Sequence, residues 1–137
     1  MAPPAVVVDA SVAVKWYLDE ESSEKAIELR RRWNASGTRV LVPDFLRLEF
    51  TNAISGQKHL TSAEKRRMVH NLLETPFDTP ITDPDMIKDA LELSLKLNAS
   101  VYDCLYLAFA IGNKAVLVTA DAKFAAKAKG YPVDVLG

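Results

Sequence analysis

The sequence predicts an α/β fold, a single-domain three-layer sandwich in which a central, mainly parallel sheet of about five strands is flanked by helices. Short β-branched runs without polar alternation are typical of strands buried on both faces of a parallel sheet. Helical patterns of ten to fifteen residues separate these runs, as right-handed crossover connections require. The 137-residue chain is long enough for one well-packed core, and we expect residues 1–137 to form one domain.

Strand and helix signals alternate through the first half of the chain. Val6, Val7 and Val8 form a β-branched run that ends at Asp9. Ser11 is a natural N-cap for the helix expected next. In chain order we expect a strand at 5–8, a short helix from Ser11, a helix from Ser22 or Ser23 through Trp33 that stops at Gly37, a strand at 40–42, and a helix introduced by Pro43 and Asp44 that ends near Gly56.

Capping signals are clearer in the second half of the chain. Thr61 and Glu64 have capping-box spacing, and Asp83 followed by Pro84 is a typical helix start. Pro80 weakens the strand signal around it, so a strand there should be short or lie at an edge. In chain order we expect a helix at 61–73, a weak strand at 77–81, a helix from Asp83 to Asn98, a nearly apolar helix at 101–111, a strand at 115–118, a helix at 122–129, and a last strand at 133–136.

Composition excludes several classes of protein. A net charge of −1 and a pI near 6.1 argue against a protein that grips nucleic acid by bulk positive charge, although basic runs at 30–32 and 65–67 are local candidates for phosphate contacts. The single cysteine, Cys104, excludes an internal disulfide and suits the reducing cytoplasm. The apolar stretch at 101–111 is too short for a membrane span, and the N-terminus carries no basic leader, so we expect neither membrane insertion nor secretion.

Four acidic residues stand in apolar surroundings. Asp9 closes the first strand, Glu49 and Asp103 interrupt apolar helices, and Asp121 follows a strand-like run. Ligands bind outside the carboxyl ends of parallel strands, so Asp9 and Asp121 should share one edge of the sheet. Glu49, about two turns into its helix, is expected to lean toward that edge, whereas strand order does not place Asp103. Carboxylates that converge repel one another and usually hold a metal ion.

Each of these acids also has a structural explanation. Asp9 and Asp121 can cap the elements that follow them, and Asp103 can complement the positive end of its helix. Glu49 can be a boundary residue of an amphipathic helix. If the acids do bind an ion together, an all-oxygen donor set selects a hard cation, so Mg²⁺ or Mn²⁺ is expected rather than zinc.

The order and spacing of these motifs resemble the PIN-domain family. The chain's size and its lack of extra modules are most similar to the VapC ribonuclease toxins of bacterial and archaeal toxin–antitoxin pairs. The resemblance covers almost the whole chain. It is carried by the run from Val6 to Ser11, Glu49 within a helix, the run from Val101 to Asp103, and the run from Thr119 to Asp121 with Phe124.

The resemblance implies a metal-dependent endoribonuclease that cuts RNA phosphodiester bonds with Mg²⁺ or Mn²⁺. It also implies a homodimer, and a small VapB-like antitoxin whose tail lies in an apolar groove formed by the early helices. Trp16, Tyr17 and Trp33 are candidates to line that groove, and core packing is the alternative explanation of these aromatic residues. The implied site consists of the catalytic, metal-binding acids Asp9, Glu49, Asp103 and Asp121, with the hydroxyl residues Ser11 and Thr119 beside them.

Two alternatives remain open: a non-catalytic PIN-like module that binds RNA or a protein, and a housekeeping RNA-processing nuclease. Two related enzyme classes fit less well. A haloacid-dehalogenase-type phosphatase needs D-x-D-x-T after its first strand, but positions 11 and 13 are Ser11 and Ala13. A receiver domain needs a lysine after its fifth strand, a position for which this sequence offers no candidate. No motif specifies an RNA target, because specificity depends on surface shape and single-strand contacts.

Overall fold

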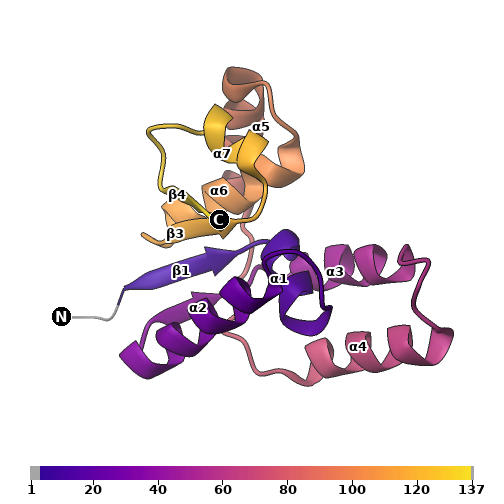
Figure 1. Ribbon diagram of the computed structural model, residues 1–137. Helices are drawn as coiled ribbons and strands as arrows, with labels where there is room; N and C mark the ends of the chain where they lie inside the picture. Colours follow the sequence, from indigo (N-terminus) through magenta and orange to yellow (C-terminus); the bar gives the residue numbers. More distant parts are fainter. Residues whose placement is uncertain (1–3, 137) are drawn as a thin grey trace.

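The computed structural model describes residues 4–136, in which a four-stranded sheet is flanked by seven helices (Figure 1). The strands are β1 (Ala5–Val8), β2 (Arg39–Leu41), β3 (Val116–Thr119) and β4 (Val133–Val135). The helices are α1 (Ala10–Tyr17), α2 (Ser23–Ser36), α3 (Leu46–Ser55), α4 (Ser62–Glu74), α5 (Pro84–Leu97), α6 (Val101–Gly112) and α7 (Ala122–Lys127). The predicted alternation of strands and helices is confirmed.

The sheet is parallel throughout, with strand order β2-β1-β3-β4. The central strand β1 pairs with β2 on one side and β3 on the other, so Val7 lies between Leu41 and Leu117. All three of these side chains are buried, as is Val8. Burial on both faces explains why the strand sequences lack polar alternation.

The segment expected as a weak strand at 77–81 does not become one. It makes a single parallel bridge, between Asp78 and Leu41 at the free edge of β2, where the Val42 amide donates to the Asp78 carbonyl at 2.9 Å. Pro76 and Pro80 lie on either side of Asp78 and have no amide hydrogen to donate to a ladder. The sheet therefore has four strands rather than about five.

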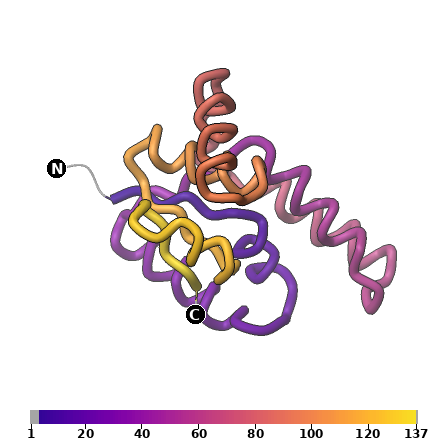
Figure 2. The backbone as a smooth tube through the Cα atoms, turned by 90° about the horizontal axis from the view of Figure 1, so that it is seen from above, coloured from indigo at the N-terminus to yellow at the C-terminus, as the bar shows by residue number. Residues whose placement is uncertain are grey.

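The helices differ in how closely they approach the sheet. Helix α6 packs against β1 and β3, and α5 packs against α6 farther from the sheet (Figure 1). Helices α3 and α4 pack together and project away from the rest of the molecule, which Figure 2 shows from above. Between residues 4 and 136, no helix combines the length and the apolar character that crossing a bilayer requires.

Helix ends follow the capping signals, with one correction. Thr61 forms the predicted capping box of α4, and Asp83 caps α5. Gly37 ends α2 with a φ of 73°, a left-handed conformation that glycine adopts without a steric penalty. The expectation that Ser11 caps α1 is wrong: Asp9 is the cap, because its carboxylate accepts a hydrogen bond from the Val12 amide.

Candidate active site

The carboxyl ends of β1 and β3 meet at one edge of the sheet, as their parallel pairing requires. Thr119, the last residue of β3, is fully buried and donates a hydrogen bond to Oδ2 of Asp9 at 2.5 Å. Its hydroxyl also accepts a hydrogen bond from the Asp121 amide at 3.1 Å. The predicted sharing of one edge by Asp9 and Asp121 is therefore confirmed, and Thr119 links the two.

The Asp9 carboxylate is held from several sides. In addition to Thr119, the Ser11 hydroxyl donates to Oδ1 at 2.5 Å and the Val12 amide donates to the same oxygen at 3.2 Å. Ser11 in turn accepts a hydrogen bond from the Ala120 amide at 3.0 Å, which ties the loop after β3 to the start of α1. Burial raises the pKa of Asp9 against the opposing effect of these hydrogen bonds. Asp9 is thus an oriented carboxylate in a poorly solvated place.

Asp103 lies in the first turn of α6, the helix that packs against β1 and β3. Its side chain is partly buried, and burial is the main reason that its pKa is raised. The charge of Asp121 raises the pKa of Asp103 further, whereas Lys127 lowers it. Asp103 in turn contributes to the raised pKa of Asp9. Asp103 therefore interacts electrostatically with both Asp9 and Asp121.

Asp121 is the most solvated of the four acids. Its side chain is exposed, and Oδ1 accepts a hydrogen bond from the Phe124 amide at 3.0 Å, which caps α7. The structural explanation considered for Asp121 is therefore correct for one of its two oxygens. The cap also fixes the carboxylate next to the Thr119–Asp9 pair, where its negative charge acts on Asp103.

Glu49 lies in the first turn of α3, closer to the helix start than expected, because α3 begins at Leu46. The residue is partly buried, and its Oε1 is shielded from solvent without a hydrogen-bond partner among residues 4–136. Tyr106 on α6 is its neighbour. The hydroxyl of this buried tyrosine also lacks a partner among the described residues, and burial and then the charges of Glu49 and Asp9 raise its pKa.

The sequence analysis did not single out Tyr106. The available signal was its spacing, three residues after Asp103 on the same helix, which puts both side chains on one side of α6. A tyrosine inside a nearly apolar helix ordinarily fills the core with its ring. Only the tertiary structure places its hydroxyl between α3 and the start of α1.

The donor set of this edge suits a hard divalent cation. Its ligands would be carboxylate oxygens, and the unpartnered Oε1 of Glu49 is a buried acceptor without a donor. Within residues 4–136, however, no three Asp, Glu, His or Cys side chains stand close enough to hold an ion in their present positions.

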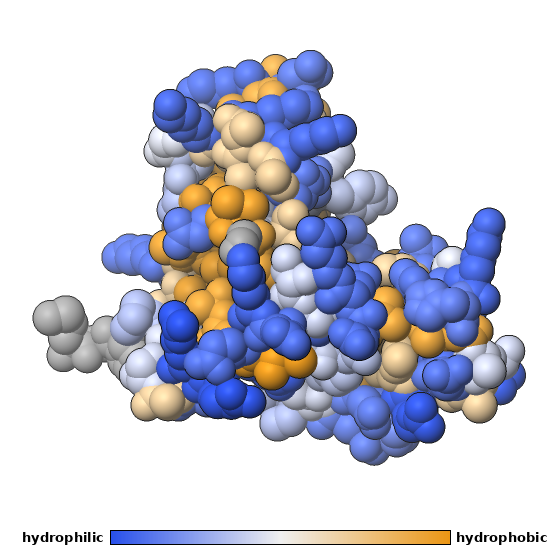
Figure 3. All heavy atoms as spheres, in the orientation of Figure 1, coloured by the Kyte–Doolittle hydropathy of each residue, from blue (hydrophilic) through white to orange (hydrophobic). Residues whose placement is uncertain are grey.

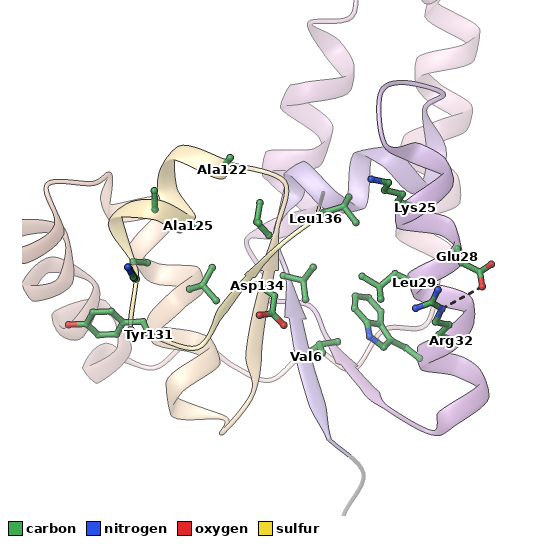
Figure 4. Close-up of a pocket in the computed structure, with 18 of the residues that line it drawn as sticks. Val6, Lys25, Glu28, Leu29, Arg32, Ala122, Ala125, Tyr131, Asp134 and Leu136 are labelled. Atoms are coloured by element: carbon green, nitrogen blue, oxygen red, sulfur yellow. Dashed lines mark ion pairs between the residues drawn. The ribbon is translucent and has the colours of Figure 1, made fainter.

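A second feature is an apolar groove on the sheet face between α2 and α7, with a volume of about 1250 Å³ (Figure 4). Small side chains such as Ala122 and Ala125 line one wall, and Leu29 and Trp33 of α2 line the other. In Figure 3, hydrophobic residues form a band over β3 and β4.

Of the three aromatic residues expected in an apolar groove, only Trp33 lines this one. Trp16 stacks on Phe77, with ring centroids 6.0 Å apart, and its Nε1 donates to the Ala26 carbonyl. Tyr17 packs edge-on against Phe50. Trp16 and Tyr17 therefore do not line the groove between α2 and α7, and both are partly buried against residues of neighbouring segments.

Known structures share this fold. A chain of the DNA-bound VapBC complex from Salmonella typhimurium superposes with a TM-score of 0.72 at 14% identity, over 98% of this chain and 99% of the other. VapC20 from Mycobacterium tuberculosis is described as a toxin that cleaves the sarcin-ricin loop. It superposes with a TM-score of 0.68 at 15% identity, over 92% of this chain and 95% of the other. A chain of VapBC2 from Rickettsia felis, bound to a promoter DNA fragment, superposes with a TM-score of 0.69 at 14% identity, over 96% of this chain and 98% of the other.

Sequence comparison provides the family. No curated protein sequence matches the chain significantly. The family model of the PIN domain matches residues 6–130, a span that runs from β1 to the residue before Tyr131 and contains all four acids. Because this match covers most of the sequence, the chain belongs to the PIN-domain family.

Proposed function

We propose that residues 1–137 form a single nuclease domain, a cytoplasmic metal-dependent endoribonuclease that acts as the toxin of a VapBC-type pair. The proposal is supported most strongly by Asp103, which interacts electrostatically with both Asp9 and Asp121. Glu49 is linked to the same site because its charge and that of Asp9 both act on Tyr106. PIN-domain VapC toxins are nucleases, and PIN-domain nucleases generally use divalent metal ions.

The residues divide the chemistry between them. Asp9 and Asp103 would be the main ligands of a Mg²⁺ or Mn²⁺ ion, and Asp121 would complete the set from the solvent side. When bound, such an ion neutralises charge that develops on phosphate oxygens and makes water a competent nucleophile near neutral pH. Ser11 and Thr119 keep both oxygens of Asp9 oriented through the reaction. Glu49 serves as a further ligand or accepts the proton of the attacking water.

The test is cleavage of a panel of structured and single-stranded RNAs by the purified chain. We expect cuts inside the RNA with Mg²⁺ or Mn²⁺, and none with EDTA. RNA binding without cleavage under every metal condition would favour the non-catalytic module instead. Cleavage that persists in EDTA would contradict the metal-dependent mechanism. Growth arrest on expression, relieved by the product of an adjacent small gene, separates a toxin from a housekeeping nuclease.

We further propose that the antitoxin inserts an apolar segment into the groove between α2 and α7. One solved structure with this fold is described as a toxin–antitoxin complex from Klebsiella pneumoniae, and another belongs to the VapBC family of toxin–antitoxin systems. The alanines of the α7 wall leave room for the larger side chains of a partner (Figure 4). In the cleavage assay the antitoxin should inhibit the wild-type chain. It should inhibit an Ala125→Arg variant much less, whereas Ala63→Arg, a matched change on exposed α4, should leave inhibition intact.

An apolar stripe on α5 supports the proposal of a homodimer. Ile87, Leu91 and Leu95 follow one another at spacings of four residues and are 53%, 49% and 71% exposed. Two copies of α5 packed antiparallel about a two-fold axis at Leu91 would set Ile87 against the partner subunit's Leu95. The same arrangement would bring Lys88 near the partner subunit's Glu92, so charges complement each other along one flank.

Replacement of the central leucine, Leu91→Glu, is expected to dissociate this dimer. Two glutamates would face each other across the axis, and we expect the dimer dissociation constant to rise on the order of 100-fold. Light scattering should give twice the chain mass of 15.1 kDa for the wild type and the single mass for the variant. Leu73→Glu on α4, where the leucine is 52% exposed, should remain dimeric. A monomeric wild type, or a dimeric Leu91→Glu, would contradict the proposal.

A further inference from the structure

Two buried oxygen atoms in the described part of the chain have no hydrogen-bond partner: Oε1 of Glu49 and the hydroxyl oxygen of Tyr106. Buried polar groups in native proteins are nearly always paired, because an unpaired one loses its contacts with water without compensation. A single such atom would be an isolated oddity. Here the two atoms belong to residues that are neighbours in space: Glu49 carries a carboxylate, and the Tyr106 hydroxyl can donate a hydrogen bond to it.

A contact between Phe45, the N-cap residue of α3, and Tyr106 of α6 brings Glu49 and Tyr106 together. The ring of Tyr106 meets Phe45 edge-on, with centroids 4.7 Å apart. Phe45 precedes Glu49 by four residues and therefore lies on the same side of α3. Glu49 acts on the Tyr106 hydroxyl through its charge and as an acceptor, although the geometry falls short of a complete hydrogen bond. A small rotation of either side chain would complete it.

The hydrogen-bond donors near the acidic residues indicate that Tyr106 pairs with Glu49 rather than with Asp9. Asp9 receives hydrogen bonds from Ser11, Thr119 and the Val12 amide, so its orientation is already fixed. The buried oxygen of Glu49 receives none among residues 4–136. An ionised carboxylate can only accept, and the neighbouring tyrosine hydroxyl is a donor of fixed position because its ring is packed on all sides.

We propose that Tyr106 is a positioning residue whose hydroxyl donates to Glu49 and fixes the direction of that carboxylate when the acidic edge holds a divalent cation. The inference rests on the proposed nuclease function, since it assigns Glu49 to the same site. Tyr106 does not itself touch the ion or the RNA. It plays the part that groups behind metal ligands usually play, which is to restrict a ligand to one useful orientation.

The test is Mn²⁺ binding to purified Tyr106→Phe, measured by calorimetry without RNA. The substitution keeps the ring and its contact with Phe45 and removes only the hydroxyl. We expect Mn²⁺ to bind roughly 10-fold more weakly than to the wild type. The melting temperature in EDTA should be unchanged or higher, because an unpaired buried hydroxyl is lost. A purely structural role predicts the reverse: a lower melting temperature and an unchanged affinity.

Two further variants show whether the effect passes through Glu49. If it does, Tyr106→Phe should weaken binding no further in a Glu49→Gln background, so the two changes are not additive. Tyr102→Phe, on the same helix but 67% exposed, should bind Mn²⁺ like the wild type. Equal affinity of Tyr106→Phe and wild type, or full additivity with Glu49→Gln, would overturn this inference alone. A wild-type chain that binds no Mn²⁺ would overturn the proposed function and this inference with it.

Discussion

The substitution Asp103→Asn is expected to lower RNA cleavage on the order of 1000-fold or more, which corresponds to about 4 kcal/mol of lost transition-state stabilisation. The amide nearly matches the carboxylate in size but binds a cation poorly and carries no charge. The same change should raise the melting temperature of the metal-free chain, because burial and the charge of Asp121 already disfavour the ionised form of Asp103. Activity and stability should therefore move in opposite directions.

Rate measurements with Mn²⁺ and thermal melts in EDTA together check this prediction. Asp89→Asn is a suitable control, since Asp89 is an exposed acid of α5, and it should change neither quantity. A variant that is inactive and also less stable would indicate unfolding rather than loss of a ligand. If Asp103→Asn cleaves at the wild-type rate, Asp103 lies outside the catalytic site.

Mn²⁺ is expected to stabilise the wild-type chain strongly. An ion that binds only the native state adds roughly 2.7 kcal/mol at a concentration 100 times its dissociation constant. For a chain of 137 residues that is a rise in melting temperature on the order of 10 °C. Thermal melts at constant ionic strength measure the rise, and sodium chloride is the control for screening. We expect Asp103→Asn to lose most of it. No shift in the wild type would count against a metal centre at this edge.

The rise in melting temperature caused by Mn²⁺ should be larger at pH 7.5 than at pH 5. The folded-state pKa values of Asp9 and Asp103 are raised above the ordinary value of 3.8. Their contribution to stability is therefore complete below about pH 3.8 and is lost as the pH rises through the folded pKa values. The metal-free chain thus loses this contribution toward neutral pH, whereas the ion binds the ionised carboxylates. If Mn²⁺ raises the melting temperature equally at both pH values, neither Asp9 nor Asp103 is a ligand.

Much of the fold follows from local sequence, because its signals act over a few residues. The capping box of Thr61 and Glu64 and the proline after Asp83 mark helix starts whatever the tertiary structure. The β-branched run at 5–8 marks a doubly buried strand for the same reason. The strand expected at 77–81 is reduced to one bridge with β2, because Pro76 and Pro80 have no amide hydrogen with which to extend the ladder.

The candidate site likewise contains residues that sequence rules could place and residues that only tertiary packing could place. The rule that ligands meet the carboxyl ends of parallel strands placed Asp9 and Asp121 at one edge, and the Thr119 hydrogen bonds agree with it. Asp103 required the docking of α6 on β1 and β3, which strand order does not determine. Ser11, expected to cap α1, instead donates to the carboxylate of Asp9, which is itself the cap.

By itself, the sequence determined the alternation of elements, the parallel sheet and the residue types of an acidic site, since periodicity, capping and donor chemistry are all properties of short segments. Only the tertiary structure decided that Glu49 and Tyr106, which are 57 positions apart, leave two unpaired oxygens beside the buried Asp9. Contacts between helices depend on how whole faces pack, and the hydrogen bonds of a buried atom depend on neighbours from distant segments.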